Sequence, residues 1–268
     1  MTRYTRQQWD AIGSLVAGKL LPGCQPHGPY SQPSIQCYEV GSRLVLDGYH
    51  KREFIYSKAT AALLGNWGAA NWNHVPDAPG HVNQDGFNGN LNAVAPAVAR
   101  SVSFTDTVSK AKDFYKGGYF VAYTTPIQQR VIISGPGAAG TSITIWLDEP
   151  LATQITLADG VTAVPSPYGN LQPGSDGYQS FMCVPLISVT NGHFFWGQVR
   201  GPCIVTPHGG TWPGVVAVSR DAYFHIDGSI DPWYIQAPAH ATSPQRAGYL
   251  MNATVNTWGD LLIMLQLD

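Results

Sequence analysis

Histidines are the first residues in the sequence that could do chemistry, since a neutral imidazole is a common metal ligand. His74 and His81 flank a loop that bears carboxylates and continues through Asp85, so this segment could hold a metal ion. Nothing in their spacing fixes a ligand geometry, and neutral surface histidines are the commoner case. The stretch Asn83–Asn88 also resembles a calcium loop, but it lacks the closing Glu of such loops. We therefore expect neither a metal nor any other cofactor.

Paired carboxylates are the next candidates, because they can act as general acid and base. Asp148 and Glu149 form the one adjacent acidic pair. They stand at the end of a predicted strand, where neighbouring side chains point to opposite faces. A glycosidase needs two carboxylates that face one another across a cleft. We therefore interpret this pair as a solvated strand end.

Motifs of known catalytic machinery are missing from the sequence. It contains no G-x-S-x-G nucleophile elbow, no P-loop and no H-E-x-x-H zinc motif. These absences predict that the protein is not an enzyme.

Charge is scarce in this chain of 268 residues. Charged residues make up 12%, about half of the usual ~25%, and the net charge is −2. The sequence has no cluster of Lys and Arg that could bind phosphates, which argues against nucleic-acid binding. No apolar run approaches the ~20 residues that span a bilayer. The first residues are not followed by the apolar core of a signal peptide, so we expect the protein to be made and kept in the cytoplasm until it assembles.

Such a neutral surface is better suited to an assembly than to a free monomer, because the cores of protein contacts are depleted of Lys, Glu and Asp. The alternative is a secreted or environmental β protein with a neutral surface. Cys24, Cys37, Cys183 and Cys203 follow neither a zinc spacing nor a C-x-x-C motif. Each consecutive pair could close a loop in an oxidising medium, but a cytosolic origin predicts free, mostly buried thiols.

The N-terminal region predicts a short helix followed by an arm. Thr5–Gln8 has the pattern of a capping box, and an apolar stripe follows it until Leu21-Pro22-Gly23 ends the helix. Residues 24–34 carry several prolines and are expected to be extended. The stripe is a candidate contact with a neighbouring subunit, and it consists of Trp9, Ile12, Val16 and Leu20.

The rest of the chain predicts an all-β fold of barrel or sandwich units. Short apolar runs alternate with Gly- and Pro-rich turns, which is typical of such units. Residues 67–96 and 229–245 lack a clear hydrophobic periodicity and are interpreted as long surface loops. The expected strands lie near 44–46, 54–56, 119–123, 130–133, 142–147, 181–189, 193–199, 203–205, 215–218, 222–226, 248–253 and 261–267.

Several of these segments resemble, in order, the motifs of capsid decoration (cement) and related virion proteins of tailed bacteriophages. The strongest is Gly192–Cys203, which is similar to a "yfWvQt.Gpa" strand pair, and Arg52–Ala59 resembles "F-x-Y-x-K-a". Each motif alone is weak, but their ordered succession is fairly specific. The other matching segments are 47–48, 117–121, 129–134, 142–151, 164–168, 246–253 and 261–267.

The resemblance implies a domain organisation. Residues 1–40 would form the helix and arm, 41–96 with 179–268 a discontinuous β-barrel domain, and 97–178 an inserted β domain. The "F-x-Y" strand at 52–58 should then pair with a strand beyond residue 181.

The resemblance also implies a function. Such proteins bind the outer surface of an icosahedral head and stabilise contacts between capsomers of the major capsid protein. We therefore expect a virion protein that is made in the host cytoplasm, and most simply a homotrimer at threefold positions of the shell, with the arm as its clamp.

An alternative is a head or tail fibre that binds a receptor or a host-surface glycan. Exposed aromatic residues in loops could stack on sugar rings, although interface contacts and loop packing explain them as well. A secreted enzyme acting on glycans has little support. Copy number separates the first two readings, since a cement protein is present in hundreds of copies per particle and a fibre in few. The loop aromatics are Trp67, Trp72, Trp212, Trp233 and Tyr234.

Overall fold

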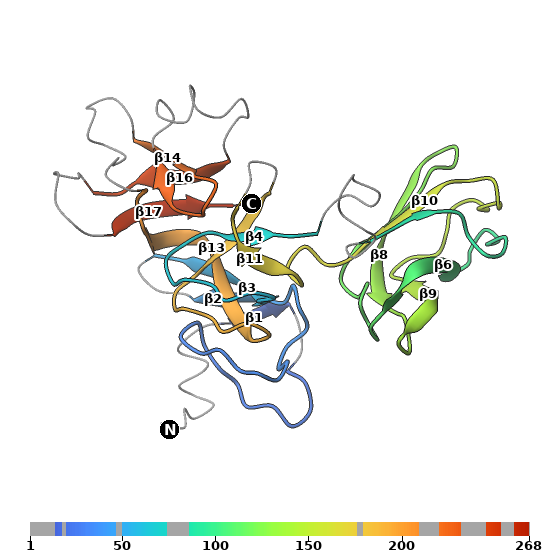
Figure 1. Ribbon diagram of the computed structural model, residues 1–268, viewed down its shortest axis with the longest axis horizontal. Coiled ribbons are helices and arrows are strands. Elements are labelled where there is room, and N and C mark those ends of the chain that lie inside the picture. Colours follow the sequence, from blue (N-terminus) through green and yellow to red (C-terminus); the bar gives the residue numbers. More distant parts are fainter. Residues whose placement is uncertain are drawn as a thin grey trace. The chain divides into compact units, whose positions relative to one another are not determined.

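The computed structural model describes most of the chain, and within these residues the protein is all-β without a helix (Figure 1). It has two compact units, one from residues 1–71 and 168–268 and the other from 72–167. No helix in the described part of the chain is long and apolar enough to cross a membrane. The described residues are 14–17, 20–46, 50–73, 86–175, 179–208, 220–231, 245–252 and 260–267.

The first unit contains, within the described residues, an eleven-stranded sheet. Strands β4, β11 and β12 branch from its main path at β13. The path runs β1 (Ser14–Ala17), β2 (Arg43–Leu46), β3 (Arg52–Lys58), β13 (Phe194–Val205), β17 (Leu261–Gln266), β16 (Arg246–Leu250), β14 (Asp221–Phe224) and β15 (Ile230–Asp231). The branch strands are β4 (Ala69–Asn71), β11 (Leu171–Pro173) and β12 (Phe181–Pro185).

Strand β13 organises this sheet, because its first half pairs with β3 and its second half with β17. The first half is buried on both faces, and this explains why its sequence is a continuous apolar run instead of an alternating one. The predicted pairing of residues 52–58 with a strand beyond 181 is confirmed, with Trp196 opposite Tyr56. The positive φ of Gly201 lets the backbone of β13 approach Lys51, whose carbonyl oxygen would lie 2.3 Å from a Cβ at this position.

Residues 20–40 cover one face of β3 and β13 and do not extend as an arm. Cys37 and Tyr38 are buried in an aromatic cluster with Tyr56 and Trp196. The Nε1 of Trp196 donates to the carbonyl of His27 at 3.0 Å. The burial of these rings explains the difference from the sequence-based expectation, since an extended arm would leave them in water.

The predicted helix lies mostly on residues 1–13, which are outside the described part of the chain, as are Trp9 and Ile12. Its final turn is corrected by the structure. Residues Ser14–Ala17, with Val16 among them, form β1 and pair with β2, Ser14 opposite Val45. Leu20 is half-buried against the aromatic cluster of its own unit. The contact of this stripe with a neighbouring subunit stays a prediction.

The second unit is a six-stranded antiparallel sheet, counted over the described residues, that curls into a nearly closed barrel (Figure 1). Its edge strands meet where the rings of Phe87 and Phe104 stack with centroids 4.1 Å apart. The amide of Asn92 also donates to the carbonyl of Ser103 at 2.9 Å. The order is β5 (Phe87–Gly89), β10 (Val161–Val164), β7 (Tyr119–Ala122), β8 (Gln128–Ser134), β9 (Gly140–Leu147) and β6 (Ser101–Lys110).

The chain passes between the units at other residues than the sequence indicated. Boundaries at 96/97 and 178/179 were expected, and they fall at 71/72 and 167/168. Strand pairing is the cause, since β5 pairs with β10 of the second unit and β11 with β4 of the first. The expected surface loop at 67–96 therefore contributes a strand to each unit, and residues 74–85 within it lie outside the described part.

Candidate functional site

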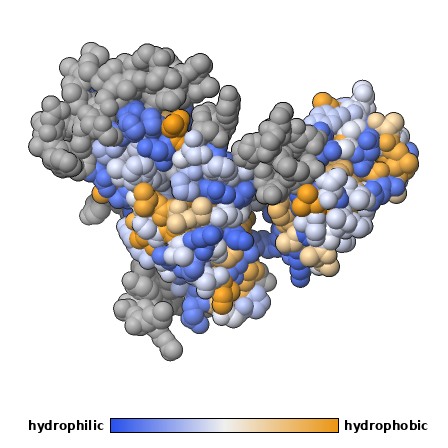
Figure 2. Space-filling view, viewed as in Figure 1, coloured by the Kyte–Doolittle hydropathy of each residue, from blue (hydrophilic) through white to orange (hydrophobic). Residues whose placement is uncertain are grey.

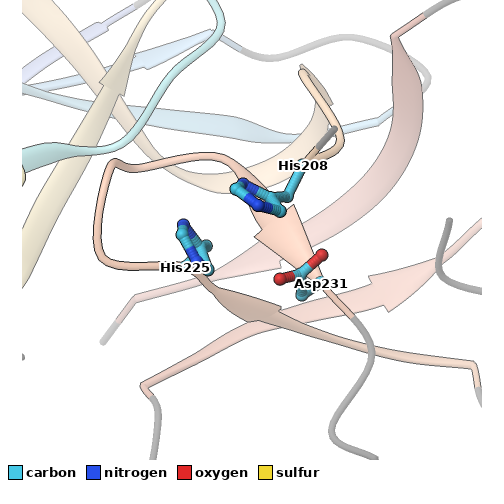
Figure 3. A group of neighbouring side chains, drawn as sticks. All are labelled: His208, His225 and Asp231. Carbon is cyan, nitrogen blue, oxygen red and sulfur yellow. The ribbon is translucent and has the colours of Figure 1, made fainter. Parts of the chain in front are cut away.

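Two histidines and an aspartate meet at the β14–β15 corner of the first unit. His208 follows β13, His225 follows β14, and Asp231 ends β15. One ligand atom of each lies within 4.8 Å of those of the other two. Figure 3 shows the two imidazole rings and the carboxylate around a common space.

Backbone hydrogen bonds hold the segments that carry these side chains. The amide of His208 donates to the carbonyl of Ile230 at 3.0 Å, and the amide of Ile230 donates to the carbonyl of Thr206 at 3.0 Å. The amide of His225 donates to the carbonyl of Ser229 at 2.8 Å, which closes the turn between β14 and β15. Position 228 in this turn requires glycine, because its φ is +91° and a Cβ would lie 2.4 Å from the carbonyl oxygen of Gly68.

Asp227 bridges the two imidazoles from this turn. One carboxylate oxygen lies 3.0 Å from Nδ1 of His225, and the other lies 3.4 Å from Nδ1 of His208. Burial alone would raise the pKa of Asp227, but hydrogen bonds from Ser229 and His225 hold it below its usual value. The carboxylate is therefore ionised at neutral pH, and it accepts from Nδ1–H of His225 and from the hydroxyl of Ser229.

The ionised Asp227 favours the Nδ1–H tautomer of His225. The Ser229 hydroxyl, which donates to Asp227, can accept from Nδ1 of His208 at 3.3 Å. When Nδ1 donates to Asp227, Nε2 of a neutral imidazole keeps its lone pair. The ring centroids of His208 and His225 are only 3.7 Å apart, and two imidazolium ions at that distance would repel strongly. Asp231, which is almost fully buried, adds a carboxylate to the two nitrogen lone pairs. Such a donor set can bind a transition-metal ion.

A second feature is an apolar strip on the outside of the second unit, which we call the outer strip. Its members project from β7, β8 and β9, and Tyr119 of β7 lies opposite Val131 of β8. Ile133 is 50% and Trp146 42% exposed. Figure 2 shows apolar patches among the polar surface of this unit. The outer strip consists of Tyr119, Val131, Ile133 and Trp146.

The carboxylates considered in the sequence have a structural role. An oxygen of Asp148 accepts from the amides of Val131, at 3.0 Å, and Glu149, at 2.9 Å. Asp148 therefore ties the end of β9 to β8 and does not face a second carboxylate of a cleft. His74, His81 and Asp85 lie outside the described residues. The four cysteines, all within the described residues, are free thiols.

A dinucleotide-like spacing also occurs at Gly135–Gly140, which reads G-x-G-x-x-G after β8. In a dinucleotide fold this motif opens a helix that leads to a parallel strand. Here it joins the antiparallel strands β8 and β9. It is therefore a hairpin connection and has no helix N-terminus for a pyrophosphate.

Sequence reasoning did not bring the cluster at the β14–β15 corner together. His208, His225 and Asp231 match no motif spacing, and they come from three separate segments, after β13, after β14 and at the end of β15. The one available signal was the turn dipeptide Asp227-Gly228, with His225 two residues before it and Ser229 directly after it. Comparisons of the chain with protein-family models, with curated proteins and with solved structures found no match.

Proposed function

We propose that the protein is a structural component of a tailed-bacteriophage virion, a decoration (cement) protein on the outer surface of the icosahedral head. In this role it stabilises contacts between capsomers of the major capsid protein. The observation that carries the proposal is the outer strip, an aromatic and apolar surface on a nearly closed barrel of a chain poor in charge. The ordered resemblance of the strand motifs to virion proteins supports it.

The chemistry of the outer strip suits contact with another protein. Trp and Tyr are enriched in interfaces and supply many of the side chains that dominate binding energy. Burial of apolar surface contributes about 25 cal/mol per Å², and few charges need to be desolvated at the same time. The curled sheet supports the same role, because edge strands that approach one another offer little template for uncontrolled strand addition.

Copy number in purified particles tests the proposal. We expect the chain in hundreds of copies in virions of the phage that encodes it, and bound to the outside of mature heads. Absence of the chain from such virions would contradict the proposal. The homotrimeric state at threefold positions is part of the proposal and is checked by light scattering of the purified protein and by image reconstruction of decorated heads.

Substitution in the outer strip tests the contact itself. We expect Trp146→Ser to weaken binding to undecorated heads on the order of 30-fold, which corresponds to about 2 kcal/mol for a central aromatic contact. Leu157→Ser is the matched control, because Leu157 is 52% exposed in the same unit but lies in a turn outside the strip. Equal affinities of the wild type and Trp146→Ser would remove the outer strip from the contact.

A receptor- or glycan-binding fibre is the second candidate. It is favoured by the exposed rings of Tyr119, Tyr123 and Trp146 on the second unit, since aromatic faces can stack on sugars. A few copies per virion, together with glycan binding that Trp146→Ser abolishes, would support the fibre role over the cement role.

A further inference from the structure

The β14–β15 corner has the ligand types of a zinc site. Zinc commonly binds two imidazole nitrogens and a carboxylate oxygen at 2.0–2.2 Å, which places neighbouring ligand atoms roughly 3.3 Å apart. The ligand atoms of His208, His225 and Asp231 lie within 4.8 Å of one another. Binding would require side-chain rotations that bring these atoms closer together, while the backbone hydrogen bonds hold the segments that carry them.

The corner also has the supporting carboxylate that metal-binding histidines use. A ligating imidazole almost always donates its other N–H to a carboxylate or carbonyl, and this orients the ring and fixes its tautomer. Asp227 accepts from Nδ1 of His225 at 3.0 Å. Its other oxygen lies 3.4 Å from Nδ1 of His208, which is also 3.3 Å from the hydroxyl of Ser229. With a proton on Nδ1, Nε2 is the nitrogen of each ring that could bind a metal.

Burial of a carboxylate completes the donor set. Asp231 is almost fully buried, and buried carboxylates are commonly hydrogen-bonded, paired or bound to metals.

We propose that His208, His225 and Asp231 bind a divalent transition-metal ion, zinc in the first instance, and that Asp227 is the positioning residue for the two imidazoles. The proposal is independent of the virion role. The metal would link the residues after β13 to the β14–β15 turn. The described residues supply three ligands, and zinc commonly takes a fourth.

Zinc titration of the full-length protein tests this site. After treatment with a chelator and its removal, we expect about one zinc ion per chain, measured by competition with a chromophoric chelator. Asp227→Asn should weaken zinc binding roughly 10- to 100-fold, the range for groups that orient metal ligands. His225→Ala and Asp231→Asn should weaken it further. His193→Ala is the matched control, since this histidine bonds Asn191 outside the cluster and its loss should leave the affinity unchanged.

A second measurement does not depend on the folding of variants. In the wild-type protein, zinc should shift the imidazole NMR resonances of His208 and His225 and leave those of His193 unchanged. Cobalt should bind with the d–d absorption bands of a site with nitrogen and oxygen ligands. Wild-type protein that takes up no zinc would overturn the proposal. So would zinc binding that perturbs neither His208 nor His225.

Discussion

Two polar clusters among the described residues differ in the groups that face their carboxylates, a lysine and a tyrosine in one and histidines in the other. In the second unit, Asp106 and Lys110 are almost fully buried and their charged atoms lie 3.5 Å apart. The hydroxyl of Tyr115 donates to the same carboxylate oxygen at 2.9 Å. In the first unit, Asp227 and Asp231 are surrounded by histidines, and one of the two carboxylates is more than a third exposed.

This difference separates a structural cluster from a binding cluster. Lys110 supplies the cation for Asp106 from the same strand, so the cluster of the second unit is neutral as folded. Burial, followed by the charge and hydrogen bond of Asp106, raises the pKa of Tyr115 and keeps its proton in place. The cluster of the first unit instead combines two carboxylates with two imidazoles, the ligand types of the metal site proposed above.

The largest effect is expected from a mutation that removes the ion pair of the structural cluster. Asp106→Ala should lower the free energy of unfolding by about 3–5 kcal/mol, because it removes the carboxylate that pairs with the buried Lys110 ammonium. Urea denaturation measures the change. Lys112→Ala, an exposed lysine two residues along the chain, should change stability by less than about 0.5 kcal/mol. A loss below 1 kcal/mol for Asp106→Ala would show that the buried pair contributes little.

Zinc binding is expected to have an intermediate effect, on the stability of the β14–β15 corner and not on that of the Asp106–Lys110 cluster. Zinc at about 100 times its dissociation constant should add roughly 2.7 kcal/mol to the stability of the corner that binds it. Hydrogen exchange should therefore slow at residues 206–208 and 225–231 and stay unchanged at 106–115. Uniform slowing across both segments would indicate that zinc does not act through the β14–β15 corner.

The smallest effect concerns an ion pair between an exposed lysine and a largely buried glutamate at the start of β3. Lys51 and Glu53 lie 2.9 Å apart with the lysine side chain mostly exposed, and the hydrogen bond from Lys51 holds the pKa of Glu53 below its usual value. The stabilisation is present above the usual pKa, about 4.3, and is lost as the pH falls through the lowered pKa. Glu53→Gln should thus cost at most about 1 kcal/mol at pH 7, and the difference from the wild type should shrink in urea melts at pH 3. A difference that grows on acidification would contradict this assignment.

Local pattern alone determined the class of fold and several strands. The runs near 54–56, 119–123, 142–147 and 193–199 predicted strands that the structure contains, because β-branched and aromatic residues between turn residues favour extended chain wherever they pack. The pairing of 52–58 with a strand beyond 181 also followed from the order of the motifs.

Strand β6 shows why pattern was insufficient elsewhere. Its inward positions are Val102, Phe104, Asp106 and Lys110. The hydrophobic alternation stops after Phe104, since a buried ion pair takes the place of apolar side chains. Sequence reasoning therefore did not identify this strand, although it is one of the longest that the structure describes.

The N-terminal segment and the histidine corner depended on contacts between distant parts of the chain. The spacing of Trp9, Ile12 and Val16 favours a helix locally, yet residues 14–17 pair with β2 as a strand, and helix propensity is weak enough for such pairing to override it. His208 joins Asp231 only because Pro207 and Ile230 form a parallel bridge. Composition and period are local properties of a chain, whereas a ligand set depends on which strand edges meet, and only the tertiary structure decided that.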